Sequence, residues 1–227
     1  MDRFVNDLLR RADAVLRRQA GVTLAPHTSI VSLAILIAIF GSLYGAVMGC
    51  YGATLGPGIW QILYSAVKVP LLLLATFSLS LPSFFVANSL LGLRSDFAAS
   101  IRALLATQAG LAIILASLSP FTFFWYASVG TYSAAVAFNA VMFALASVSA
   151  QWILRGYFQP LILRNSRHRW MLRVWIVVYA FIGIQMGWVL RPFIGDPSLP
   201  VQFFRSESWG NAYVEVFRLF WRILSSG

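Results

Sequence analysis

Residues 59–93 read IWQILYSAVKVPLLLLATFSLSLPSFFVANSLLGL, an apolar run in which Lys68 is the only charged side chain. At 1.5 Å per residue this run would form a single helix of about 52 Å. The hydrocarbon core of a bilayer is about 30 Å thick. The run is therefore long enough to cross a membrane and too long for one upright span.

The composition of the whole chain agrees with a membrane location. Of its 227 residues, 59% are hydrophobic and 11% are charged, whereas a soluble domain carries about 25% charged residues. The runs are continuously apolar and do not alternate, which disfavours a β-barrel. Backbone groups in lipid have to find partners within their own segment, so the spans are expected to be helices. The sequence predicts an all-α integral membrane protein.

Apolar runs predict five transmembrane helices, separated by segments that differ in composition. The run at 120–131, PFTFFWYASVGT, is expected to form an aromatic turn, and 155–173 a basic loop. The predicted spans are Ser29–Cys50, one span within Ile59–Leu93, Ile101–Leu118, Tyr132–Leu154 and Met171–Leu190.

Both ends of the chain carry amphipathic patterns, in residues 1–20 and 208–224. Each pattern places apolar residues on one face at helical spacing and charged residues on the other. Such helices are typical of the membrane interface, although the first also fits a helix packed against the protein's own loops. The expected organisation is an amphipathic cytoplasmic helix in 1–28, a five-span bundle in 29–191, and an extracytoplasmic tail with an amphipathic helix in 192–227.

The distribution of arginine predicts the orientation of the chain. Twelve arginines fall on the side of the N-terminus, and four fall on the other side, all of them beyond the fifth span. The positive-inside rule then places the N-terminus in the cytoplasm and the C-terminus outside, here in a bacterial inner membrane. With a net charge of +10, the expected anionic partners are lipid headgroups and not nucleic acid, because most basic residues lie beside spans.

Two registers are possible for the span that contains Lys68. A span over Ile59–Leu81 would place Lys68 near mid-membrane, where it would need a carbonyl, a water or a carboxylate from another chain. A span over Val69–Leu93 would place Lys68 at the outer end, Pro70 in the first helical turn and Ile59–Val67 in the interface. Because a lysine at mid-membrane costs about 2.5–3.5 kcal/mol, the second register is favoured.

Two spans carry faces of small residues. Gly41, Gly45 and Gly49 form GxxxGxxxG in the first span, and Ala137, Ala140 and Ala144 follow a similar spacing in the fourth. Small residues allow helices to approach closely in lipid. These faces predict packing within the chain or, alternatively, contact with another membrane subunit or a second copy.

The remaining candidate residues are polar. Lys68, Asn139 and Gln185 lie within predicted spans, and Arg164, Arg167, Arg169 and Arg173 form a possible headgroup-binding cluster, although such a cluster also serves simply as a topology signal. No metalloprotease, CxxC or P-loop motif occurs, the seven acidic residues lie outside the predicted spans, and Cys50 is the single cysteine. The sequence therefore predicts no enzyme activity, metal or cofactor.

Residues 68–105, KVPLLLLATFSLSLPSFFVANSLLGLRSDFAASIRALL, resemble Yip1-type membrane proteins in their hydropathy and five-span setting. Those proteins also have prolines in the second span and a Gly–x–x–x–aromatic stretch after it, which Gly92 to Phe97 approximates. The resemblance implies a non-enzymatic membrane organiser with protein partners and carries over no site residues.

Taken together, these features predict an accessory or scaffolding subunit of a larger inner-membrane complex. The alternative is a channel or transporter for a small or anionic solute. In that alternative, Lys68, Asn139 and Gln185 would line a shared cavity.

Overall fold

The computed structural model describes residues 2–17, 29–55, 58–128, 131–196, 199–205 and 214. These residues form helices and connecting segments, with no strand among them. In chain order the helices are α1 (Asp2–Leu16), α2 (Ile30–Leu55), α3 (Ile59–Leu90), the short 3-10 helix η1 (Arg94–Asp96), α4 (Phe97–Ser128), α5 (Tyr132–Arg164) and α6 (His168–Val189).

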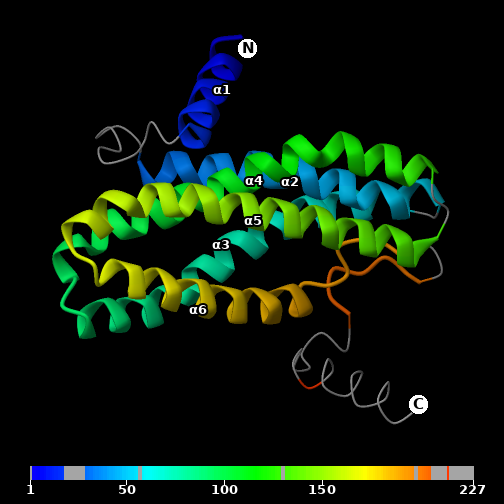
Figure 1. Ribbon diagram of the computed structural model, residues 1–227. Coiled ribbons are helices and arrows are strands. Elements are labelled where there is room, and N and C mark those ends of the chain that lie inside the picture. Colours follow the sequence, from blue (N-terminus) through cyan, green and yellow to red (C-terminus); the bar gives the residue numbers. More distant parts are fainter. Residues whose placement is uncertain are drawn as a thin grey trace.

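Five of these helices, α2 to α6, are long and apolar enough to cross a membrane, so the chain is a multi-pass membrane protein. They run side by side along one axis, whereas α1 lies across it (Figure 1). Helix α4 is at the centre and has an unbroken buried stretch from Ala103 to Ile113. A helix that is apolar all round is suited to such an enclosed position.

Two helices extend further than the sequence predicts. The expected aromatic turn at 120–131 is wrong, because α4 continues through Pro120 to Ser128. Of its aromatic residues, Trp125 packs on α5, stacked on Phe138 at 4.5 Å between ring centroids. Phe121, Phe123 and Phe124 are exposed on the outside of the helix. Proline is tolerated within membrane helices where neighbouring groups satisfy the freed carbonyl.

The expected basic loop at 155–173 is also mostly helical. Helix α5 continues through Pro160 to Arg164, and α6 begins at His168. Tyr157 and Phe158 are buried in this extension, and the Tyr157 hydroxyl donates to the Val15 carbonyl of α1 at 2.8 Å. Helix α5 thus keeps a buried apolar face beyond the predicted end of the span, and the packing of this face stabilises the helix there.

The glycine face of α2 packs against α3 of the same chain. A Cβ added at Gly41 would lie 3.3 Å from the Cα of Pro70, and one at Gly49 would lie 2.6 Å from the Cα of Ile62. A Cβ at Gly45 would overlap the Ser65 carbonyl oxygen. All three obstacles are backbone atoms, which cannot rotate away, so α2 and α3 approach each other only because these positions lack side chains.

The predicted small-residue face of α5 does not pack within the bundle. Ala137, Ala140 and Ala144 are exposed, and the buried face is formed by Ala135, Asn139, Met142, Ala146 and Ala150. Small residues lie on both sides of α5, so their spacing did not identify the inward face. The prediction that these three alanines pack within the chain is therefore wrong. Their contact with a partner stays a prediction.

The predicted terminal helices fall partly outside the described residues. Helix α1 forms within the first predicted segment and buries Ala12 and Val15 against the bundle. Of the second segment, only Val214 is described, so the predicted helix over 208–224 lies outside the part of the chain that the structure describes.

The α2–α3 contact generates a stability prediction. Gly45→Ala is expected to lower the free energy of unfolding by at least about 2 kcal/mol, because the added methyl group forces two backbones apart. Thermal unfolding in detergent measures the effect. Gly187→Ala in α6 is the matched control, since a Cβ there meets nothing within 4 Å. Equal unfolding temperatures for the two variants would contradict the contact.

Candidate functional site

Lys68 is fully buried (0% exposed) within α3. Its Nζ donates to the Pro192 carbonyl at 2.7 Å and lies 4.9 Å from the centroid of the Phe203 ring. Both partners belong to the irregular chain that follows α6. A carbonyl and an aromatic face are groups that stabilise an ammonium outside water.

This irregular chain, residues 190–196 and 199–205, folds back against α3 and is called the return segment. The Ser65 hydroxyl donates to the Phe193 carbonyl, and the Gln61 Nε2 donates to the same carbonyl at 3.3 Å. The Tyr132 hydroxyl donates to the Ile194 carbonyl at 3.4 Å. Three consecutive carbonyls of non-helical backbone thus receive side-chain donors, as buried irregular backbone requires in a membrane protein.

These contacts correct the favoured register for Lys68. Helix α3 is continuous from Ile59 to Leu90, so Pro70 lies inside it and not in its first turn. Lys68 does not cap an outer helix end but points into a buried site. The carbonyl that accepts from Lys68 lies 124 residues away in the sequence, so the sequence does not indicate which group offsets the cost of burying the lysine.

Asn139 joins three spans. Its Oδ1 accepts from the Tyr44 hydroxyl of α2 at 3.0 Å, and its Nδ2 donates to the Tyr126 hydroxyl of α4 at 2.5 Å. The same Nδ2 lies 2.8 Å from the Ala135 carbonyl. A buried amide that uses both of its donors in this way connects helices and presents no free donor to a solute.

The structure does not bring the three predicted intramembrane polar residues together. Lys68 contacts the return segment, whereas Asn139 contacts Tyr44 and Tyr126. Gln185 is partly buried on α6 and has an interaction of its own. None of the three lines the cavity described next.

A cavity of about 380 Å³ lies between α3, α4, α5 and α6, and is called the seam cavity. Most of its lining is apolar, including Leu72, Phe143 and Ile184. Its polar lining includes Gln108, whose Oε1 accepts from the Tyr179 hydroxyl at 2.6 Å. Two further lining atoms, Thr76 Oγ1 and Gln151 Oε1, are buried without a hydrogen-bond partner.

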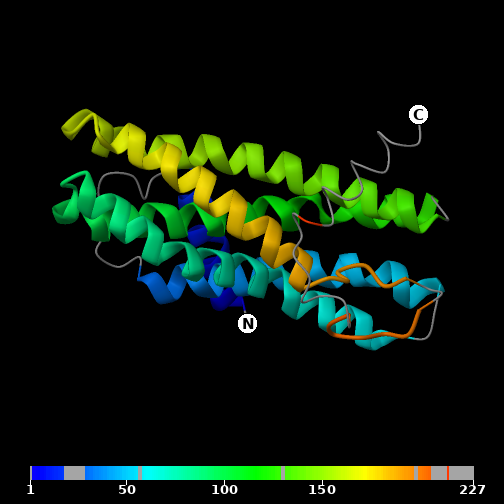
Figure 2. The same ribbon diagram turned by 90° about the horizontal axis from the view of Figure 1, so that it is seen from below.

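The geometry of the bundle explains this cavity. Helix α6 packs mainly on α3, while α5 packs mainly on α4. Figure 2 shows α5 and α6 diverging from their shared turn. Two adjacent helices that separate along their length leave space between them, and here small residues such as Ala150 and Gly183 line it.

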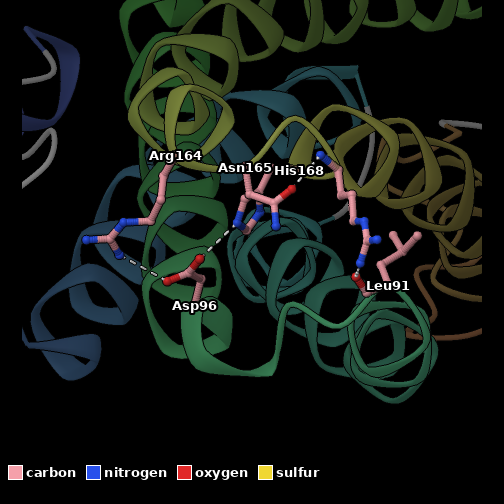
Figure 3. A network of polar contacts seen from close by, with 6 residues as sticks. Leu91, Asp96, Arg164, Asn165 and His168 are labelled. Carbon is pink, nitrogen blue, oxygen red and sulfur yellow. Dashed lines mark hydrogen bonds and ion pairs between the residues drawn. The ribbon is translucent and has the colours of Figure 1, made fainter.

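The turn between α5 and α6 meets η1 at one end of the bundle, called the arginine end. Figure 3 shows Asp96 between Arg164 and His168. Arg164 Nη1 lies 3.2 Å from Asp96 Oδ1, and His168 Nε2 lies 3.1 Å from Asp96 Oδ2. His168 is fully buried. Its contact with Asp96 therefore joins the α5–α6 turn to η1 in the interior of the bundle.

The predicted headgroup arginines therefore have different surroundings. Arg167 Nη1 donates to the Leu91 carbonyl at 3.1 Å, and Arg173 stacks over Trp170 at 4.8 Å. Arg169 lines an open groove of about 520 Å³ together with Arg155, Trp152 and Gln159. Arg164 and Arg167 thus link turns of the bundle, while Arg169 and Arg155 share a groove that the sequence did not indicate.

Among the described residues, no three His, Cys, Asp or Glu side chains are close enough together to hold a metal ion. Thr76 and Gln151 were absent from the predicted site. The sequence signal for Gln151 was its polarity near the end of a span. Thr76 gave no such signal, because a threonine in an apolar run is common in membrane helices, where its hydroxyl usually bonds to its own backbone.

The contacts of Lys68 generate a second prediction. Lys68→Met is expected to lower the free energy of unfolding by about 1.5–3 kcal/mol, because it removes a charge-assisted hydrogen bond and leaves the Pro192 carbonyl unsatisfied. Thermal unfolding in detergent provides the measurement. Val67→Met is the control, since Val67 is exposed on the same helix. A Lys68→Met variant as stable as this control would refute a structural role for the lysine.

No protein-family model, curated protein or solved structure matches the chain. These comparisons therefore contribute nothing to the assignment of function. The function rests on the side chains of the site and of the outer faces of the bundle.

Proposed function

We propose that this chain is a non-enzymatic accessory or scaffolding subunit of a larger complex in a bacterial inner membrane. The observation that carries the proposal is the outward face of α5, where Ala137, Ala140 and Ala144 are exposed. An organising role is also what the resemblance to Yip1-type proteins implies.

The alanines of this face lie beside larger exposed side chains. Val136, Val141 and Leu145 are exposed on the same helix. Small residues between larger ones form a shallow recess that allows another helix to approach closely. Small residues do not improve the packing of lipid tails to the same extent. This face therefore favours a protein neighbour, either another subunit or a second copy.

The contacts of the buried polar residues favour this role over transport. Lys68 is bound by the return segment, and Asn139 is bound by two tyrosines. A transport site needs groups that can exchange partners with a solute. Asn139 instead uses its donors and acceptor to hold helices together, and Lys68 holds the return segment against α3.

Helix α1 supports attachment to the membrane surface. It lies across the axis of the bundle (Figure 1), which corresponds to the membrane plane if the spans are upright. Val5, Leu9 and Leu16 are exposed on it, as are Arg10 and Arg11. Exposed apolar residues beside arginines suit a helix at the boundary between acyl chains and anionic headgroups.

The proposed orientation can be tested by labelling. In a Cys50→Ser background, Gln202→Cys in the return segment is expected to react with a membrane-impermeant maleimide on intact cells. Ser166→Cys in the α5–α6 turn is expected to react only after the membrane is opened. Both positions are exposed, so burial does not limit labelling. The opposite pattern would reverse the proposed topology.

The subunit role predicts a specific sensitivity on α5. Ala140→Leu is expected to release the chain from its complex, because the larger side chain fills the recess. Gentle solubilisation of native membranes, followed by quantification of chains that co-purify in fixed proportion, measures the loss.

The matched control is Val141→Leu, which changes an exposed position that is already large. It is expected to leave the complex intact. A wild-type chain that purifies alone as a monomer, or an Ala140→Leu variant that keeps its partners, would contradict the proposal.

A further inference from the structure

We propose that the seam cavity binds a lipid alcohol, meaning a membrane-soluble molecule with an apolar body and one hydroxyl group. The cavity holds about 380 Å³, within the range of small-molecule sites. Its two unpartnered polar atoms, on α3 and α5, indicate which chemical group the ligand carries.

Thr76 supplies the first of these atoms. Its side chain is 1% exposed, and its Oγ1 has no hydrogen-bond partner. Several other hydroxyls in the bundle bond to their own helix, as Thr107 does to the Ala103 carbonyl at 2.9 Å and Ser80 to the Thr76 carbonyl at 2.7 Å. Because Thr76 does not, its hydroxyl is available to donate into the cavity.

Gln151 supplies the second atom from the opposite side. Its Oε1 is buried without a partner and can only accept a hydrogen bond. A ligand hydroxyl matches this pair, since its oxygen accepts from Thr76 while its hydrogen is donated to Gln151. A ketone or ether can only accept, and would leave Gln151 unsatisfied.

The polarity of the lining also changes along the bundle axis. On α3, α4 and α5, the polar residues Thr76, Gln108 and Gln151 lie nearer the arginine end than Leu72, Leu111 and Phe143 do. The apolar residues Leu154, Trp175 and Ile176 close the cavity at the arginine end itself. An amphipathic ligand would therefore place its hydroxyl toward the arginine end and its apolar body toward the middle of the span.

Trp175 lines the cavity, so its fluorescence can report a ligand bound there. We suggest titrating the purified chain, in phosphatidylcholine nanodiscs, with a dibrominated long-chain alcohol, which quenches nearby tryptophan fluorescence. The wild type is expected to show saturable quenching that Trp175→Phe removes. The methyl ether of the same alcohol is expected to bind roughly fivefold more weakly, because it cannot donate to Gln151.

Two substitutions test the roles of the polar atoms. Gln151→Met is expected to abolish the difference between alcohol and ether, and Thr76→Val to weaken both. Ser149→Ala is the control, because Ser149 is exposed and bonds to the Leu145 carbonyl of its own helix. Absence of saturable quenching, or equal affinity of the wild type for alcohol and ether, would overturn the proposal.

Discussion

Hydrocarbon offers no hydrogen-bond partners, and this constraint organises the interior of the protein. Each polar group within the spans has to be satisfied by another part of the chain or by something that enters from the membrane. Lys68 and Asn139 illustrate the first solution, with acceptors and donors from distant segments. Thr76 and Gln151 illustrate the second, because they face a cavity without partners of their own.

The same constraint connects the glycine face of α2 with the return segment. Close approach at Gly41, Gly45 and Gly49 fixes α3 against α2. An adjacent face of α3 then presents the side chains of Gln61, Ser65 and Lys68 to the backbone of the return segment. The lysine therefore fastens the chain that follows α6 to the bundle. Its position within an apolar run reflects this structural role.

The sequence predicted the features that depend on local composition. The existence of five apolar helices, and the positions where most of them begin, followed from hydropathy. The ends of α4 and α5 did not, because the aromatic run at 120–131 was expected to form a turn and the basic run at 155–173 a loop. Tertiary contacts instead continue both helices. The inward face of α5 was also missed, since alanines occur on both of its sides.

The candidate site was less predictable because its partners lie far apart in the sequence. A backbone carbonyl such as that of Pro192 carries no sequence signal as the acceptor for Lys68. The seam cavity depends on how α5 and α6 diverge, which hydropathy does not encode. Thr76 became significant only because the structure shows that its hydroxyl lacks the bond to its own helix that Thr107 makes.

The central claim is that in-span polar groups are structural where they have partners within the chain, and available for binding where they line a cavity without such partners. A comparison of the thermal unfolding of Asn139→Leu and Thr76→Val in detergent tests it most directly. Asn139→Leu is expected to lower the unfolding temperature, because two tyrosine hydroxyls lose their partner. Thr76→Val is expected to leave it unchanged or raise it, because an unpaired hydroxyl is replaced by a methyl group of the same shape. The reverse order of the two variants would contradict the claim.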